Sequence, residues 1–84
     1  MSKSLDPARY PTAYMDLAAR FEAAPHRAHF IDGKTPKGAL ALRLDLYGFQ
    51  RAMKATAAAD YPSFTVARMF LAGSRVRVVH PDHY

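Results

Sequence analysis

The chain has 84 residues, half of them apolar or aromatic, with six prolines, four glycines and no cysteine. This is too hydrophobic for a disordered chain, and the length suits one domain that buries roughly 60–65% of the surface its unfolded form exposes. The lack of cysteine excludes disulfides, thiolate catalysis and cysteine-ligated metals, and it fits a cytoplasmic location. We find no apolar run that suits a signal peptide or a membrane span, so no membrane is expected as a partner.

The formal net charge of +5 is distributed unevenly. Residues 1–32 contain four basic and four acidic groups, whereas residues 33–59 contain five basic groups against Asp45 alone. Residues 61–80 then add three arginines and no acid. The positive excess therefore follows the first predicted helix, as expected for a surface that binds a polyanion, although a modest net charge also serves solubility.

A first helix is predicted after Pro11, with Thr12 as N-cap and Pro25 as the residue that stops it. Its apolar face has the i, i+3, i+4, i+7 spacing and consists of Tyr14, Leu17, Ala18 and Phe21. Residues 28–31, which include the apolar pair Phe30-Ile31, are predicted to form a short strand or extended connector. Asp32-Gly33 then predicts a turn.

A long helix is predicted from about Pro36 to Ala58, with Thr35 as its N-cap. Leucine at every second position from residue 40 to 46 also fits a strand, but the continued apolar stripe favours a helix. One stripe of this helix consists of Leu42, Leu46, Phe49 and Met53, and a second, about 140° away, of Leu40, Leu44 and Tyr47. Both need partners. A strip of Ala41, Gly48 and Ala52 is small enough for close packing against another element.

Residues 64–79 predict a β-hairpin that reverses at Ala72-Gly73 or Gly73-Ser74. In either register one face carries Phe64, Val66, Arg68, Phe70, Arg75, Arg77 and Val79, and the other carries Thr65, Ala67, Met69, Leu71, Val76 and Val78. Two alternatives stay open at this stage: residues 63–72 also fit a short helix capped by Ser63, and a helix could cover the arginine face.

The fold class expected from these elements is α+β, in the order helix, short strand, long helix, β-hairpin, with two helices packed on a small antiparallel sheet. Residues 11–80 would form the single domain, residues 1–10 a flexible N-terminal segment and residues 81–84 a mobile tail.

Several stretches resemble catalytic or metal-binding motifs but depart from the pattern that the chemistry requires. Gly33-Lys34-Thr35 resembles the end of a phosphate-binding loop, but the glycine required five positions earlier is Ala28. The pairs His26-x-x-His29 and His80-x-x-His83 have a weakly specific metal-ligand spacing, and no metal or cofactor is assigned. No assembled nucleophile or carboxylate pair is evident, so the protein is not expected to be an enzyme.

The function expected is that of a small accessory protein that binds DNA or RNA, with arginines pairing phosphates and phenylalanines stacking bases. The residues assigned to this role are Arg68, Arg75, Arg77, Phe64 and Phe70, with Lys34, Lys37, Arg43, Arg51 and Lys54 extending the positive surface. The alternative function is a protein–protein interaction module or homodimer that uses the stripe of Leu40, Leu44 and Tyr47.

Overall fold

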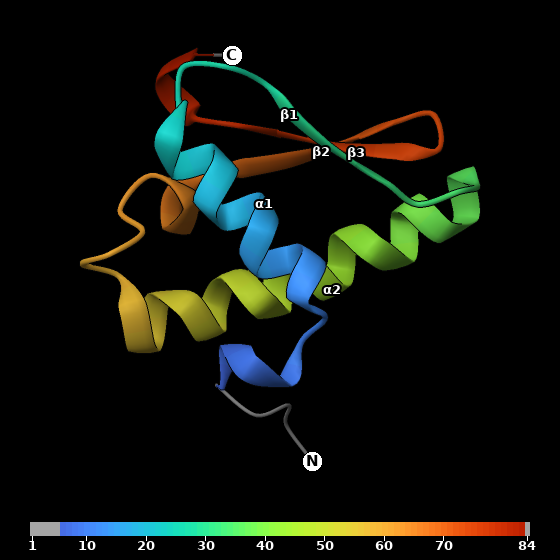
Figure 1. The fold of residues 1–84 in the computed structure, drawn as a ribbon. Helices are drawn as coiled ribbons and strands as arrows, with labels where there is room; N and C mark the ends of the chain where they lie inside the picture. The colour runs from blue at the N-terminus through green and yellow to red at the C-terminus, as the bar shows by residue number, and fades with distance from the viewer. Residues whose placement is uncertain (1–5, 84) are drawn as a thin grey trace.

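The computed structural model describes residues 6–83, in which two helices cover one face of a three-stranded antiparallel sheet (Figure 1). The helices are α1 (Thr12–Ala23) and α2 (Pro36–Ala57), and the strands are β1 (His29–Asp32), β2 (Arg68–Ala72) and β3 (Arg75–Val79). Three short 3-10 turns, η1 (Pro7–Arg9), η2 (Phe64–Val66) and η3 (Pro81–His83), complete the described chain. The predicted fold class and element order are confirmed.

The helix ends follow local chemistry. α2 begins at Pro36, because the hydroxyl of Thr35 accepts a hydrogen bond from the N–H of Gly38 at 2.9 Å and so satisfies one of the free donors of the first turn. α1 has no such cap: Thr12 is its first helical residue rather than its N-cap, which is Pro11. The observed helices otherwise lie within one residue of the predicted bounds.

The sheet has the strand order β1-β3-β2, so β3 is central. The hairpin reverses through Gly73 and Ser74, and Gly73 has a φ of +66°, which a residue without a Cβ adopts at little cost. The N–H of Gly33 donates to the carbonyl of Ser74 at 2.7 Å. This bond places the loop between β1 and α2 beside the tip of the hairpin.

The core lies between the sheet and the two helices and is rich in aromatic rings. Phe21, Phe49 and Phe64 are fully buried, and the Phe64 ring makes edge contacts with Phe21 and Phe49 at centroid distances of 6.2 and 5.8 Å. Beneath the sheet they pack with Met69, Val76 and Val78 and, from the helices, with Leu17 and Leu46. The prediction that the inward face of the hairpin packs in the core is thus confirmed at Met69, Val76 and Val78.

The start of the hairpin differs from the prediction. Residues 64–66 form the 3-10 turn η2, and β2 begins only at Arg68. Two side chains hold this turn: the carboxylate of Glu22 accepts the N–H groups of Ser63 and Phe64 at 2.8 and 2.6 Å, and Gln50 donates to the carbonyls of Phe64 and Ala67. Phe64 is therefore turned into the core instead of continuing the alternation of the strand.

The N-terminal boundary of the packed chain also lies earlier than residue 11. The ring of Tyr10, which follows η1, contacts Tyr14 and Phe49 at centroid distances of 6.0 and 5.4 Å. A Cβ built on Gly48 would come within 3.0 Å of the Tyr10 hydroxyl, so the predicted small-residue strip of α2 does receive a close neighbour. Residues 1–5 and residue 84 lie outside the described residues. The described helices include none long and apolar enough to cross a membrane.

Candidate nucleic-acid interface

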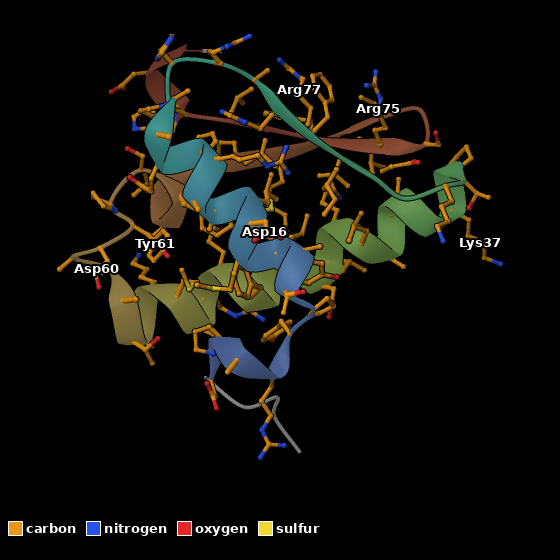
Figure 2. The ribbon with its side chains drawn as sticks, viewed as in Figure 1. Asp16, Lys37, Asp60, Tyr61, Arg75 and Arg77 are labelled. Atoms are coloured by element: carbon orange, nitrogen blue, oxygen red, sulfur yellow. The ribbon has the colours of Figure 1, made fainter. Side chains whose placement is uncertain are left out.

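The face of the sheet that points away from the helices carries most of the predicted site. Cross-strand partners share a face, and the register pairs Phe30 with Arg77, and Arg77 with Phe70. Arg68 and Arg75 lie on the same face by the two-residue period of the strands. Figure 2 shows Arg75 and Arg77 projecting away from the helix layer. The expected arginine and phenylalanine surface therefore exists at four of its five residues, with Phe64 the exception.

Phe30 was not assigned to this surface from the sequence. The pairing of β1 with β3 brings it there, so that a row of ring, guanidinium and ring crosses the three strands at Phe30, Arg77 and Phe70. The sequence does predict a strand around Phe30, but the partner strand lies more than forty residues away. No local pattern specifies that pairing.

The arginines lie over the rings. The guanidinium carbon of Arg75 is 4.5 Å from the ring centroid of Phe30, and that of Arg77 is 5.4 Å from the ring centroid of Phe70. These are cation–π distances, and each such contact contributes about 0.5–1 kcal/mol at an exposed site. They keep the cationic groups on the sheet face and close to the rings.

One acidic residue also belongs to this face. Asp32, at the end of β1, lies directly opposite Arg75 in the register, whereas the hairpin taken by itself carries no acid. The carboxylate of Asp32 accepts a hydrogen bond from the N–H of Lys34 at 2.8 Å, within a turn where Lys34 has a φ of +72°. Negative charge is therefore placed at the hairpin-tip end of the face, and the arginine and phenylalanine row lies further along the strands.

The sequence predicts Phe64 on this surface, and that prediction is wrong. Phe64 has no exposed surface, because η2 turns its ring between Phe21 and Phe49. A base cannot stack on a ring that no solvent reaches. Phe70, which is 37% exposed, is accessible.

The five cations expected to extend the surface do not form one continuous patch with it. Lys34 is exposed and lies in the loop beside the hairpin tip, and Lys37 is exposed in the first turn of α2, at one end of the molecule in Figure 2. Arg43, Arg51 and Lys54 belong to α2, which packs on the opposite face of the sheet. The helix cations therefore form a second positive region in the helix layer.

The predicted partner stripe is exposed in two of its three members. Leu40 and Leu44 are 44% and 63% exposed. Tyr47 is half-buried, and its hydroxyl donates to the carbonyl of Met69 at 3.2 Å and accepts from the N–H of Met69 at 3.3 Å. Its polar group is thus used inside the molecule, on the backbone of the edge strand β2.

A depression of about 490 Å³ opens between α1, α2 and the loop after β1. At its wall the hydroxyl of Tyr14 donates to the carboxylate of Asp45 at 2.7 Å. Burial raises the pKa of Tyr14 far above its ordinary value, and the Asp45 carboxylate raises it further by accepting a hydrogen bond from the phenol and by its negative charge. The depression also contacts Asp32 and Lys34, and a phenol held in its neutral form provides no nucleophile there.

Of the four histidines in the two pairs, His26, His29 and His80 have described side chains, and the side chain of His83 lies outside the description. Nε2 of His29 lies 2.9 Å from the carbonyl of Ala24, and its ring contacts that of Phe21. Nδ1 of His80 accepts from the N–H of Asp82 at 3.1 Å. No group of three or more histidine and acidic side chains able to share a metal ion occurs among the described residues.

Comparison of the chain with models of known protein families, with curated proteins and with solved structures finds no match. The class to which the protein can be assigned is therefore defined by its fold and by the composition of its surface. It is a small α+β domain whose helices cover one face of an antiparallel sheet and whose opposite face carries arginines and aromatic rings.

Proposed function

We propose that this protein binds single-stranded nucleic acid on the open face of its sheet. The observation that carries the proposal is the row of Phe30, Arg77 and Phe70 across the three strands, with Arg75 beside it. Unpaired bases stack on aromatic faces, and guanidinium groups pair with phosphates. An exposed β-sheet whose aromatic side chains stack unpaired bases is a known solution to this recognition problem.

The spacing of the row suits a strand whose bases are free. Neighbouring β-strands lie about 4.8 Å apart, so Phe30 and Phe70 are separated by roughly 10 Å with Arg77 between them. Two bases of one strand would occupy the two rings, and the arginines now lying over those rings would move to the phosphates. A duplex hides its base faces in the stack and would be left with the phosphate contacts alone.

The charge contribution is tested by fluorescence anisotropy with labelled single-stranded and double-stranded DNA and RNA, at about 50 and 200 mM salt. We expect the wild-type protein to bind single strands in the micromolar range and to weaken steeply with salt. The double variant Arg75→Glu, Arg77→Glu should lose binding. The matched control is Arg9→Glu, Arg20→Glu, which makes the same change in net charge at exposed positions of the helix side and should retain most of the affinity.

The stacking contribution is tested by replacing the rings and keeping the apolar surface. Phe30→Leu and Phe70→Leu should each weaken single-strand binding by about 1–3 kcal/mol, the usual contribution of one stacked base. Binding to duplexes should change little. Single-strand affinity that is unaffected by both substitutions would contradict the stacking role, and absence of binding at low salt would remove the proposal altogether.

A further inference from the structure

Five large hydrophobic side chains remain exposed among the described residues. Phe70 belongs to the open face of the sheet, and Val66 lies in the turn before β2. The other three, Leu40, Leu44 and Leu71, lie on α2 and on β2, which is an edge strand, since only β3 pairs with it. Exposed apolar side chains that adjoin one another are typical of an interaction surface.

Leu71 and the two leucines of α2 belong to one surface. Leu71 shares the helix-facing side of the sheet with Met69, and the Tyr47 hydroxyl fixes Met69 to α2. From Met69 the strand runs toward the hairpin tip, which the bond between Gly33 and Ser74 places beside the start of α2 (Figure 1). Leu71 is about 7 Å along the strand from Met69, and Leu44 and Leu40 are about 4.5 and 10.5 Å along the helix from Tyr47, in the same direction. We call Leu40, Leu44 and Leu71 the leucine surface.

Four cations of α2 share the angular side of the helix on which Leu40 and Leu44 lie. Lys37 is one turn from Leu40, and Arg43 is the neighbour of Leu44 in the chain, whereas Arg51 and Lys54 lie about 10.5 and 15 Å beyond Leu44 along the helix axis. The only acid of α2, Asp45, points to the other side, where it accepts the hydrogen bond from Tyr14. Neither β2 nor β3 contains an acid. The occupant of this surface must therefore combine apolar side chains with negative charge.

Arg43 adds an independent indication. Its Nε is buried and has no hydrogen-bond partner among the described residues. A buried donor without an acceptor is costly, and the rest of this half-buried guanidinium keeps its positive charge close to the surface. An acidic group that docks on the leucine surface would offset this cost by its charge.

Two features distinguish between possible occupants. In a two-fold symmetric dimer the surface would meet a second copy of itself, so the interface would bring together two sets of these cations without an acid of α2, β2 or β3 between them. An added β-strand would have to displace the Tyr47 hydroxyl, which already satisfies both outward backbone groups of Met69. We infer that the leucine surface docks an acidic amphipathic segment of another protein, through side-chain contacts with Leu40, Leu44 and Leu71 and with the neighbouring cations.

The probe for this inference is a random peptide library displayed on phage and selected against the folded protein. Enriched peptides should combine leucine-like residues with aspartate or glutamate. Leu44→Asp should weaken their binding at least about tenfold, as expected at the centre of a docking surface. Leu44 is 63% exposed, so this variant should keep the wild-type circular dichroism spectrum and unfolding midpoint.

Further variants test whether the cations beside the leucine surface contribute to peptide binding. They also distinguish this inference from the proposed nucleic-acid binding. Arg51→Glu, Lys54→Glu should also weaken the acidic peptides, whereas the control Arg9→Glu, Arg20→Glu should not. Leu44→Asp should leave single-strand binding on the sheet face unchanged. The inference is overturned if selection enriches no peptide sensitive to Leu44→Asp, if the enriched peptides lack acidic residues, or if sedimentation shows a dimer that Leu44→Asp dissociates.

Discussion

At the scale of single residues, Tyr14 shows how the fold changes the chemistry of a side chain. It is 6% exposed and donates a hydrogen bond to Asp45, a carboxylate on a different helix. Burial first, and then the hydrogen bond and charge of Asp45, raise its pKa well above the ordinary value of 10.0. The neutral phenol is the form that the folded protein stabilises, so this residue links stability to pH on the alkaline side.

We expect Tyr14→Phe to lower the free energy of unfolding at pH 8 by about 1–2 kcal/mol, since the Asp45 carboxylate loses its donor. In the wild-type protein the stabilisation from Tyr14 is complete below pH 10, the pKa of an unfolded tyrosine, and is lost as the pH rises above it. The variant should show a shallower loss in that range. Urea unfolding over a pH series measures both effects, and Tyr61→Phe is the control for removing a tyrosine hydroxyl. Equal alkaline slopes in the wild type and Tyr14→Phe would contradict the linkage.

At the scale of elements, the 3-10 turn η2 determines how much of the hairpin face is available. Glu22 on α1 and Gln50 on α2 bind its backbone from two sides, and β2 therefore begins at Arg68. The alternation of residue types predicts a strand through residues 64–72. This local pattern contains no information about Glu22 and Gln50, which are distant in sequence, and so it misses the turn. Long-range hydrogen bonds decided the local conformation here.

Glu22→Ala should lower the free energy of unfolding by about 1.5–3 kcal/mol, the range for hydrogen bonds to a charged acceptor, because two N–H groups lose their partner. Glu22→Gln should retain part of the stability, since its amide oxygen still accepts. Asp16→Ala removes an exposed acid from the same helix and should have little effect. Denaturant unfolding measures the series, and hydrogen exchange at Ser63 and Phe64 should accelerate only in the Glu22 variants. A Glu22→Ala protein as stable as Asp16→Ala would show that the turn does not depend on this carboxylate.

At the scale of the whole molecule, the fold places some phenylalanines in the core and others on the open face of the sheet. Phe64 closes the contact between α1, α2 and the sheet through edge contacts with Phe21 and Phe49. Phe70 lies on the opposite side of the sheet and is 37% exposed. Two residues that the hairpin pattern assigns to the same face therefore lie on opposite sides of the sheet, one buried and one exposed.

Phe64→Ala should destabilise the protein by about 3–5 kcal/mol, which is a large part of the stability of a domain this small. Its thermal midpoint should fall by more than about 10 °C. Phe70→Ala should leave the midpoint within a few degrees of the wild type and, under the proposed function, weaken single-strand binding. Calorimetry and anisotropy on the two variants make the comparison. A Phe64→Ala protein that keeps its thermal midpoint but loses nucleic-acid binding would indicate that the Phe64 ring lies on the binding surface and not in the core.

The sequence by itself determined the helices, the two-residue turn region at Gly73, the inward stripe of Met69, Val76 and Val78, and the arginines on the opposite side of the hairpin. These features depend on periodicity and turn chemistry within short stretches of chain. Only the tertiary structure decided that Phe30 joins Arg77 and Phe70, that Phe64 is buried and that Tyr47 closes part of the β2 edge. Each of these depends on residues distant in sequence, whose pairing is selected by the packing of the whole core rather than by any local pattern.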